Sequence, residues 1–395
     1  MPWKETDAVN QRIEFVLRAL KTDNFRALCQ EYGISAKTGY KWRERFFAEG
    51  LAGMEDQSRR PKSSPGGLSE TVVCEMIRIK QKHLAWGPRK VRKIYARMHA
   101  QTPSESSFKR VLERAGYTHK RKLRRSQQAG RLHSGKRATT PNEVWTVDFK
   151  GWWYGAHGGR CEPLTVRDEF SRYVLELRAM PDAKGQTVRE SFERLFERHG
   201  LPGAIRSDNG SPFANVAAVL GLTRLSAWWV ALGIDLERGR PGCPQDNGAH
   251  ERLHLDIGRE LESQRLGEQQ PVLDEWRRTF NEERPHEALG MRTPVELYSR
   301  SNREFKGTPD DLSYPGMESR KVQVHGRIRW AGEPIFISTA LSGWSVGLEP
   351  LRGSAQWNVW FGRLLLGQME PATASFEPAR SPAGVPECEL KTDEQ

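Results

Sequence analysis

The stretch "EVWTVDFKGWW" (143–153) decides the fold of the central part of the chain. Its β-branched and aromatic residues are typical of a buried strand, and the strand ends at an acid, Asp148. The segment "EPLTVRDEFSRYVLELRAM" (162–180) continues the strand composition, and "GQTVRESFERLFERHG" (185–200) has the apolar spacing of an amphipathic helix. Further strand and helix patterns alternate after it. The succession predicts an α/β domain with a mixed sheet over residues 141–300.

Three carboxylates stand where active sites of α/β domains collect, beyond the ends of strands. Asp148 follows the first strand, and Asp208 follows the short strand "AIRSD". Glu251 lies 43 positions later, in the predicted helix "NGAHERLHLDIGRELE" (247–262). At about 100° per residue, Glu251 projects roughly 200° away from the apolar stripe of this helix. That stripe consists of Leu253, Ile257 and Leu261. Glu251 is therefore expected to point into an open site.

Three converging carboxylates repel one another unless cations lie between them. Oxygen ligands with room for substrate oxygens suit Mg²⁺ or Mn²⁺. Two such ions about 3.5–4 Å apart activate an attacking hydroxyl and stabilise the leaving oxygen in phosphoryl transfer. The pattern predicts such a two-ion site at Asp148, Asp208 and Glu251. Asp168, at another strand end, is predicted to be structural and to pair with Arg172.

The helix that carries Glu251 also contains a second motif. His250-Glu251-Arg252-Leu253-His254 matches H-E-x-x-H, in which two histidines bind Zn²⁺ and the glutamate acts as general base. A zinc metalloprotease is therefore an alternative that uses the same segment. In the phosphoryl-transfer interpretation, His250 is expected at the surface, and His254 is expected to contact DNA or to tune the third carboxylate.

Composition favours a nucleic-acid partner. The chain has 395 residues, which predicts several domains, and its formal net charge is +12. The first residues form no apolar signal region and no apolar run of 18 residues occurs, so a cytoplasmic, nucleoid-associated protein without a membrane segment is expected. The five cysteines are scattered and include no C-x-x-C pair, which argues against a disulfide framework or a cysteine zinc site.

Residues 8–55 predict a first helix-turn-helix domain. Gly33 supplies the turn between two helices, and Ser35 is a natural N-cap for the second, basic helix. A glycine inside that helix, Gly39, lowers its helical propensity. A helical hairpin with a solvated basic face is the alternative interpretation. As a recognition helix, it would present four side chains to a DNA groove, namely Lys37, Thr38, Lys41 and Arg45.

A linker rich in Pro, Gly, Ser and Arg (56–68) precedes a second predicted helix-turn-helix domain at residues 69–118. Thr102 is the expected N-cap of its last helix, in a capping box with Glu105. The side chains of that helix available for DNA are Lys109, Arg110 and Arg114. The basic linker that follows, 119–140, is expected to add phosphate contacts from Lys120, Arg121, Lys122, Arg124 and Arg125.

The C-terminal part changes character again. Short apolar segments separated by Gly and Pro predict a small β-barrel or sandwich over residues 305–370, and the barrel is the predicted form. The segment 371–395 is rich in Pro, Ala and Glu and is expected to be a disordered tail. The predicted fold class is thus multidomain, α + α/β + β: tandem helix-turn-helix domains, a mixed-sheet core and a small C-terminal β-barrel.

The central segments resemble a known family. "VWTVDFKG" (144–151), "IRSDNGSPF" (205–213) and "PGCPQDNGAHERLH" (241–254) are similar to the three acid motifs of bacterial insertion-sequence transposases of the Asp-Asp-Glu type. The catalytic core of that family is shared with retroviral integrases. The resemblance implies a ribonuclease-H-like core in which Asp148, Asp208 and Glu251 bind Mg²⁺ or Mn²⁺. The spacing between the last two acids is longer than in integrases.

The same resemblance implies a function and partners. It implies a DNA transposase that binds the ends of its element, hydrolyses a phosphodiester bond there and joins the freed 3′-hydroxyl to target DNA. It also implies DNA contacts from Gln245 and Asn247. Because the joining of two ends needs two active sites, a homodimer or tetramer on DNA is expected. A DNA-binding regulator with an inactive core is a further alternative, against which the intact acids at all three positions argue.

Overall fold

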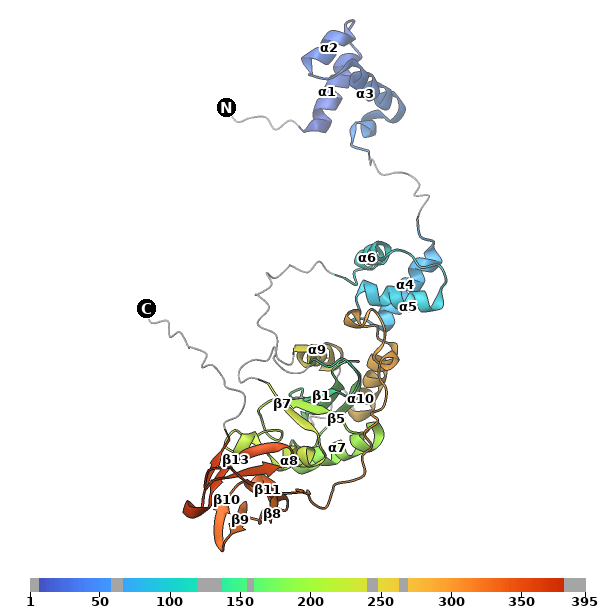
Figure 1. The fold of residues 1–395 in the computed structure, drawn as a ribbon. Coiled ribbons are helices and arrows are strands. Elements are labelled where there is room, and N and C mark those ends of the chain that lie inside the picture. The colour runs from blue at the N-terminus through green and yellow to red at the C-terminus, as the bar shows by residue number, and fades with distance from the viewer. Residues whose placement is uncertain are drawn as a thin grey trace, which may run out of the picture. The chain divides into compact units, whose positions relative to one another are not determined.

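The computed structural model describes residues 7–57, 67–118, 137–154, 160–239, 248–262 and 269–379. Its contacts divide the chain into two compact units, Met1–Ser69 and Glu70–Gln395 (Figure 1). The first unit contains three helices, and the second contains three further helices, a mixed sheet with its covering helices, and a C-terminal region of antiparallel strands. Within the described ranges, no helix has the length and apolar character needed to cross a membrane.

The first unit is a three-helix domain with α1 (Ala8–Ala19), α2 (Phe25–Glu31) and α3 (Ala36–Glu49), followed by the 3-10 turn η1 (Gly50–Met54). The predicted cap of α3 is confirmed, because Ser35 Oγ accepts the backbone N–H of Thr38 at 3.2 Å. The helix-turn-helix prediction for this segment is confirmed as a local fold.

Gly39 has a packing role that outweighs its cost to helix propensity. A Cβ at this position would lie 2.6 Å from Cys29 Sγ and 3.0 Å from ring atoms of Phe15 and Phe25. Since real Cβ contacts are not that short, only glycine lets α3 approach α1 and α2 this closely. The residue that argues against a helix in isolation is therefore required by the packing of the three helices.

The second three-helix block consists of α4 (Glu70–Lys82), α5 (Pro88–Met98) and α6 (Glu105–Arg114). The prediction of Thr102 as the N-cap of α6 is wrong, because Ser104 Oγ accepts the N–H of Ser107 at 3.3 Å. The Thr102 hydroxyl instead donates to the carbonyl oxygen of His99 at 3.4 Å and closes the turn before the helix.

This block shares a compact unit with the sheet domain. Its basic side chains pair with acids of the segment after α10 (Gln269–Arg278). Lys82 Nζ lies 3.4 Å from Glu283, Arg89 lies 3.4 Å from Glu287, and Arg97 lies 3.6 Å from Glu296. Arg89 also pairs with Glu105 of α6 at 2.6 Å.

The core of the second unit is a five-stranded sheet in the order β5-β4-β1-β6-β7. β1 pairs antiparallel with β4, as does β4 with β5, whereas β1, β6 and β7 run parallel. The predicted mixed sheet is therefore confirmed. The strands are β1 (Val144–Phe149), β4 (Pro163–Asp168), β5 (Val174–Ala179), β6 (Ala204–Ser207) and β7 (Asp235–Arg238).

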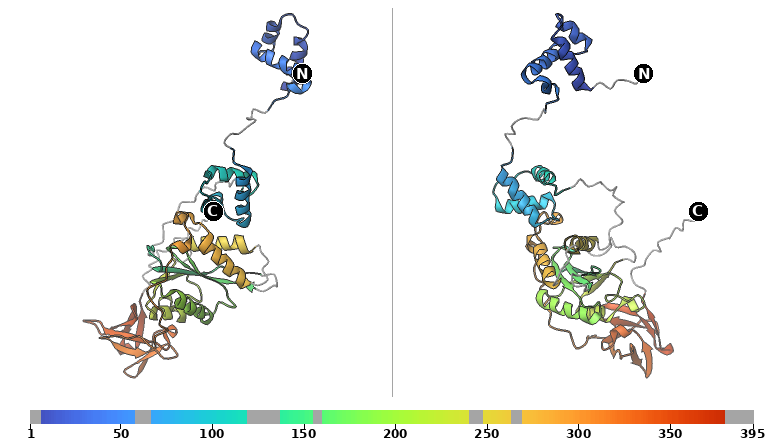
Figure 2. Two further views of the ribbon diagram at one scale, coloured as in Figure 1. Left: turned by 90° about the vertical axis from the view of Figure 1, so that its right-hand side faces the viewer. Right: turned by 180° about the vertical axis from the view of Figure 1, so that it is seen from behind.

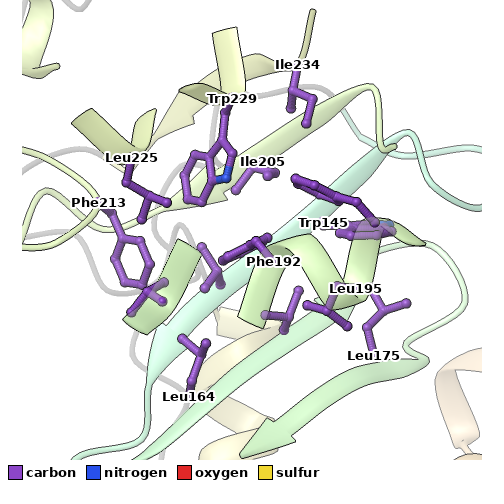
Figure 3. Close-up of a cluster of buried hydrophobic side chains, with 14 of the residues drawn as sticks. Trp145, Leu164, Leu175, Phe192, Leu195, Ile205, Phe213, Leu225, Trp229 and Ile234 are labelled. Atoms are coloured by element: carbon purple, nitrogen blue, oxygen red, sulfur yellow. The ribbon is translucent and has the colours of Figure 1, made fainter. Parts of the chain in front are cut away.

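Helices cover both faces of the sheet (Figures 1 and 2). On one face, α7 (Gly185–His199) and α8 (Arg224–Ala231) bury Phe192, Leu195 and Trp229 against the strands (Figure 3). On the other, α9 (Gly248–Ile257) and α10 pack on the opposite side chains of β5. α9 continues into the π-helical turn η4 (Gly258–Glu262), and α10 into η5 (Thr279–Glu283).

Helix α8 joins the sheet domain to the C-terminal region. Trp228 and Trp229 belong to the core of the sheet domain, whereas Ala227 and Val230 pack with residues of the C-terminal strands. A helix that is apolar on all sides is expected to be buried on all sides, and α8 is. Tryptophan and valine on opposite sides of one short helix thus give the two regions a continuous core.

The C-terminal region contains a five-stranded antiparallel sheet in the order β14-β13-β12-β11-β8 and a two-stranded sheet of β10 and β9. The strand prediction is confirmed, but the described residues form no closed barrel, since β14 and β8 are the sheet edges. The strands are β8 (Glu318–Lys321), β9 (Arg327–Trp330), β10 (Glu333–Phe336), β11 (Ser345–Pro350), β12 (Trp357–Phe361), β13 (Leu364–Glu370) and β14 (Ser375–Pro378).

The predicted boundary of the disordered tail at residue 371 is wrong. β14 pairs with β13 over four residue pairs, and Phe376 packs against the C-terminal core. Packing of the Phe376 ring against the core, together with the pairing to β13, stabilises this strand despite its Pro- and Ala-rich surroundings. Residues 380–395 lie outside the described part of the chain.

Candidate active site

Asp148 and Asp208 lie at the same edge of the sheet. β1 and β6 are parallel neighbours, and Thr146 is level with Arg206, so the acids two positions further along each strand come to one edge. The Asp148 side chain is 23% exposed, and Asp208 is exposed. The strand-end prediction for both residues is consistent with this placement.

Glu251 belongs to the exposed side of α9. The predicted stripe of Leu253, Ile257 and Leu261 is buried in one cluster with residues of β5 and α10. Glu251, on the opposite side, is exposed. The helix therefore presents this carboxylate outward, as the angular spacing predicts.

The three acids share one electrostatic environment. Burial, and after it the negative charges of Asp208 and Glu251, raise the pKa of Asp148 to about 7 against the lowering effect of a hydrogen bond from the Phe149 backbone N–H. Across the described ranges, no group of three or more His, Cys, Asp or Glu side chains is arranged to hold a metal ion. The donor set nevertheless fits a hard cation, because it consists of carboxylate oxygens whose mutual repulsion a cation would relieve.

A tight turn presents Asp208. A Cβ at Gly210 would lie 2.9 Å from Asp208 Oδ2, so the glycine lets the turn fold back against the carboxylate. The Asn209 side chain donates to the Gly239 carbonyl oxygen at 2.7 Å and fixes the turn to the end of β7. The Asp-Asn-Gly sequence is therefore both a turn and part of the candidate site.

Arg238 is a site residue that the sequence patterns do not single out. Its guanidinium donates to Ser207 Oγ at 2.7 Å, and Ser207 immediately precedes Asp208. Burial lowers the pKa of Arg238 to about 10, and the charge of Asp208 counteracts that shift. The only signal for it is topological, since the parallel pairing of β6 and β7 places Arg238 level with Ser207.

The histidines of H-E-x-x-H point into the protein, so the prediction of His250 at the surface is wrong. His250 is fully buried, with Nδ1 at 2.8 Å from Thr146 Oγ1 and Nε2 at 2.6 Å from Thr165 Oγ1. His254 is 7% exposed, and its Nε2 lies 2.9 Å from the same Thr165 oxygen. The expectation that His254 contacts DNA is wrong as well, because its ring packs beneath the helix and its Nδ1 lies 3.9 Å from Asp148 Oδ2.

The hydrogen-bond pattern fixes the tautomer of His250. The Thr165 hydroxyl has one proton and lies 2.8 Å from the Asp148 carbonyl oxygen, which can only accept. We infer that Thr165 accepts N–H groups from both histidines and that Thr146 donates to His250 Nδ1. Burial lowers the pKa of both rings, to about 4 for His254, which keeps them neutral. Both nitrogens of His250 are therefore engaged, and the zinc-protease alternative loses a ligand.

Asp168 is structural as predicted, but the prediction that it pairs with Arg172 is wrong. The carboxylate accepts hydrogen bonds from the Asn142 N–H at 2.7 Å, the Ser171 N–H at 2.7 Å and the Ser171 hydroxyl at 2.5 Å. A buried carboxylate that closes its own turn in this way needs no arginine.

The predicted DNA-contacting residues fall into three groups. Lys37, Lys41, Lys109, Arg110 and Arg114 are exposed on α3 and α6. Thr38 is half-buried with its hydroxyl 2.9 Å from Ser35 Oγ, and Arg45 lies over the Trp42 ring at 5.1 Å. The remaining residues lie outside the described part of the chain, namely Lys120, Arg121, Lys122, Arg124, Arg125, Gln245 and Asn247.

Comparisons with known proteins find two kinds of domain in the chain. Two family models described as integrase core domains match residues 138–244 and 232–294. Models described as a helix-turn-helix domain and a homeodomain-like domain match residues 11–62 and 38–112. The chain thus combines an integrase core domain with helix-turn-helix domains.

Relatives of the chain come from bacterial insertion elements. It is 25% identical to an uncharacterized protein of insertion element IS407 from Burkholderia multivorans, over 63% of the chain and 88% of that protein. It is 24% identical to an uncharacterized protein of insertion element IS476 from Xanthomonas euvesicatoria, over 62% and 70%. The catalytic core domain of BIV integrase is a structural neighbour with 23% identity and a TM-score of 0.32, covering 40% of this chain and 93% of that one.

Proposed function

We propose that the chain is a DNA transposase whose chemistry takes place at Asp148, Asp208 and Glu251. The observation that carries the proposal is the parallel pairing of β1 with β6, which brings Asp148 and Asp208 to one edge of the sheet. Glu251, on the exposed side of α9, would complete the site. The integrase core models and the insertion-element relatives support the same function.

These three side chains would hold Mg²⁺ or Mn²⁺, in a site for two ions. When bound, the ions supply Lewis-acid activation of an attacking hydroxyl or water and stabilise the leaving oxygen at the scissile phosphate. The proposed reaction is hydrolysis at the element ends followed by transfer of the 3′-hydroxyl ends to target DNA. Asp148 and Asp208 are fixed by the pairing of β1 with β6, and Glu251 is fixed by the anchoring of α9.

The histidine network positions the third acid. His250 directly precedes Glu251 and is bound by Thr146 of β1 and Thr165 of β4. Thr165 also binds the backbone of Asp148. One hydroxyl therefore links the strand of the first acid to the helix of the third, so that a shift of α9 would break buried hydrogen bonds. We assign His250 as a positioning residue for Glu251.

The remaining parts of the chain would bind DNA. The exposed basic residues of α3 and α6 and the net charge of +12 favour contacts with phosphates. The contacts assigned to residues 120–125 and to Gln245 and Asn247 remain predictions. A dimer or tetramer would supply the two active sites that the joining of two ends requires.

The proposal is tested with linear DNA that carries the sequences flanking the coding region. With Mg²⁺, the wild-type protein should cleave at the element ends and join them to a second DNA, and Asp208→Asn should do neither. The matched control Glu197→Gln removes an exposed carboxylate on α7 and should retain activity. Equal cleavage by Asp208→Asn and the wild type would overturn the mechanism. Specific binding without any cleavage by the wild type would favour the regulator.

A further inference from the structure

The hairpin that follows Asp148 carries two exposed aromatic rings. β2 (Trp153–Tyr154) pairs antiparallel with β3 (Arg160–Cys161). Trp152 is 52% exposed and Tyr154 is 64% exposed. Every other tryptophan in the described ranges is buried or half-buried. This exposed pair of large rings, four and six positions after a candidate catalytic acid, is therefore a candidate binding surface.

The hairpin is anchored to the helix that carries Glu251. Trp153, between the two exposed rings, is 8% exposed and packs in one cluster with Leu253 and Ile257 of α9. Because side chains alternate along a strand, the inward position of Trp153 directs Trp152 and Tyr154 to the other side. The rings thus lie on the segment that leaves the end of β1, four and six positions after Asp148.

The rings are arranged for stacking beside a cation. The ring centroids of Trp152 and Tyr154 lie 5.2 Å apart at 72°, an edge-to-face pair that fixes both rings. The Arg160 guanidinium lies 5.1 Å from the Trp152 ring centroid, and it also pairs with Glu162 at 2.7 Å. Two exposed rings with an arginine over one of them suit a partner that is both planar and anionic, which describes a nucleotide.

We propose that Trp152 and Tyr154, with Arg160, form a stacking surface for an unpaired nucleotide of the DNA strand at the active site. The proposal rests on the proposed function and deepens it, since it states that the DNA end is opened where it is cut. A base in a duplex already stacks on its neighbours, so only an unpaired base gains from these rings. Arg160 beside the ring favours this anionic partner over a second copy of this chain.

The test measures binding without chemistry, in protein carrying Asp208→Asn. The probe is a fluorescently labelled single-stranded oligo-dT of about ten nucleotides, with affinity read by anisotropy. The change Trp152→Ala with Tyr154→Ala should weaken binding by about 10-fold or more, since it removes the rings on which a base would stack. Trp152→Phe should retain most of the affinity. Phe336→Ala, which removes a 53% exposed ring from β10, should change nothing.

Two further measurements complete the test. The double variant should bind a duplex of the same length within about 2-fold of the parent protein, and photocrosslinking of 5-iododeoxyuridine DNA should label Trp152 or Tyr154. Unchanged oligo-dT affinity in the folded double variant would overturn the proposal, as would an equal loss for duplex or a change of oligomeric state. If Asp208→Asn cleaves normally but the oligo-dT result holds, the proposed function fails and the stacking surface stands.

Discussion

The two sides of helix α9 differ in how completely their polar side chains are hydrogen-bonded within the protein. On the inner side, the His250 nitrogens and His254 Nε2 all have threonine hydroxyls within 2.9 Å. On the outer side, Glu251 is exposed. Burial and the negative charges of Asp208 and Glu251 raise the pKa of Asp148. The buried polar groups of the inner side are hydrogen-bonded, whereas the Glu251 carboxylate of the outer side is exposed.

The difference shows which residues of H-E-x-x-H carry out chemistry. A protein gains stability by satisfying buried polar groups, whereas repulsion among carboxylates costs stability and persists where a ligand relieves it. The histidines therefore stabilise the helix, and the acids form the candidate site. Four experiments test this difference between the two sides of α9.

Loss of the outer carboxylate should abolish activity and leave the fold intact. We expect Glu251→Gln to lower the rate of DNA cleavage by roughly three orders of magnitude, about 4 kcal/mol of transition-state stabilisation. Its unfolding free energy should stay within about 0.5 kcal/mol of wild type, because the side chain is exposed. Cleavage kinetics and denaturant unfolding check both expectations. A variant that cuts DNA at a normal rate would remove Glu251 from the site.

Loss of the His250 imidazole, on the inner side of α9, should mainly lower the stability of the fold. His250→Ala removes a fully buried ring and its hydrogen bonds to Thr146 and Thr165, which should lower the unfolding free energy by about 3 kcal/mol. Urea unfolding measures this, with His325→Ala, at an exposed position, as the control. A loss below about 1 kcal/mol would show that the network does not hold the helix.

The stability of the metal-free protein should depend on pH because the pKa of Asp148 is raised. The pKa of Asp148 is raised from 3.8 to about 7 in the folded state, so its contribution to stability is full below about pH 4 and is lost as the pH rises through 7. The loss is at most about 4 kcal/mol. Asp148→Asn should remove it, so that the variant gains stability relative to wild type between pH 4 and 8. Parallel stability curves for the two proteins over that range would contradict the raised pKa.

The smallest expected effect concerns zinc. Because both nitrogens of His250 are engaged with threonine hydroxyls, the purified protein should contain no stoichiometric zinc. Elemental analysis after dialysis checks this. One tightly bound zinc per chain that disappears in His250→Ala would return the site to the metalloprotease interpretation.

The mixed sheet and the place of each acid at the end of a strand or on a helix could be predicted because their signals are local. A strand composition that ends at an acid, repeated at Asp148 and Asp208, fixes the edge at which the two residues meet. The apolar stripe of α9 likewise fixes the outward direction of Glu251. Each of these conclusions needs only the periodicity of one element.

The rest depends on contacts between distant segments. The inward direction of His250 could not be predicted without its partners Thr146 and Thr165, which are 104 and 85 positions away. Gly39 is unfavourable by propensity and required by packing against Cys29. Composition favours disorder after residue 371, but one core contact by Phe376 orders β14. In each case tertiary packing outweighs a local preference.

The most direct test of the central claim is the thermal unfolding of metal-free protein titrated with Mn²⁺ at pH 8. A cation that binds the folded state raises Tm in proportion to the logarithm of its concentration above Kd. We predict a rise in Tm for the wild type and for Glu197→Gln, and its loss in Glu251→Gln and Asp148→Asn. An equal rise in Glu251→Gln and the wild type would contradict the claim that the outer side of α9 forms the metal site.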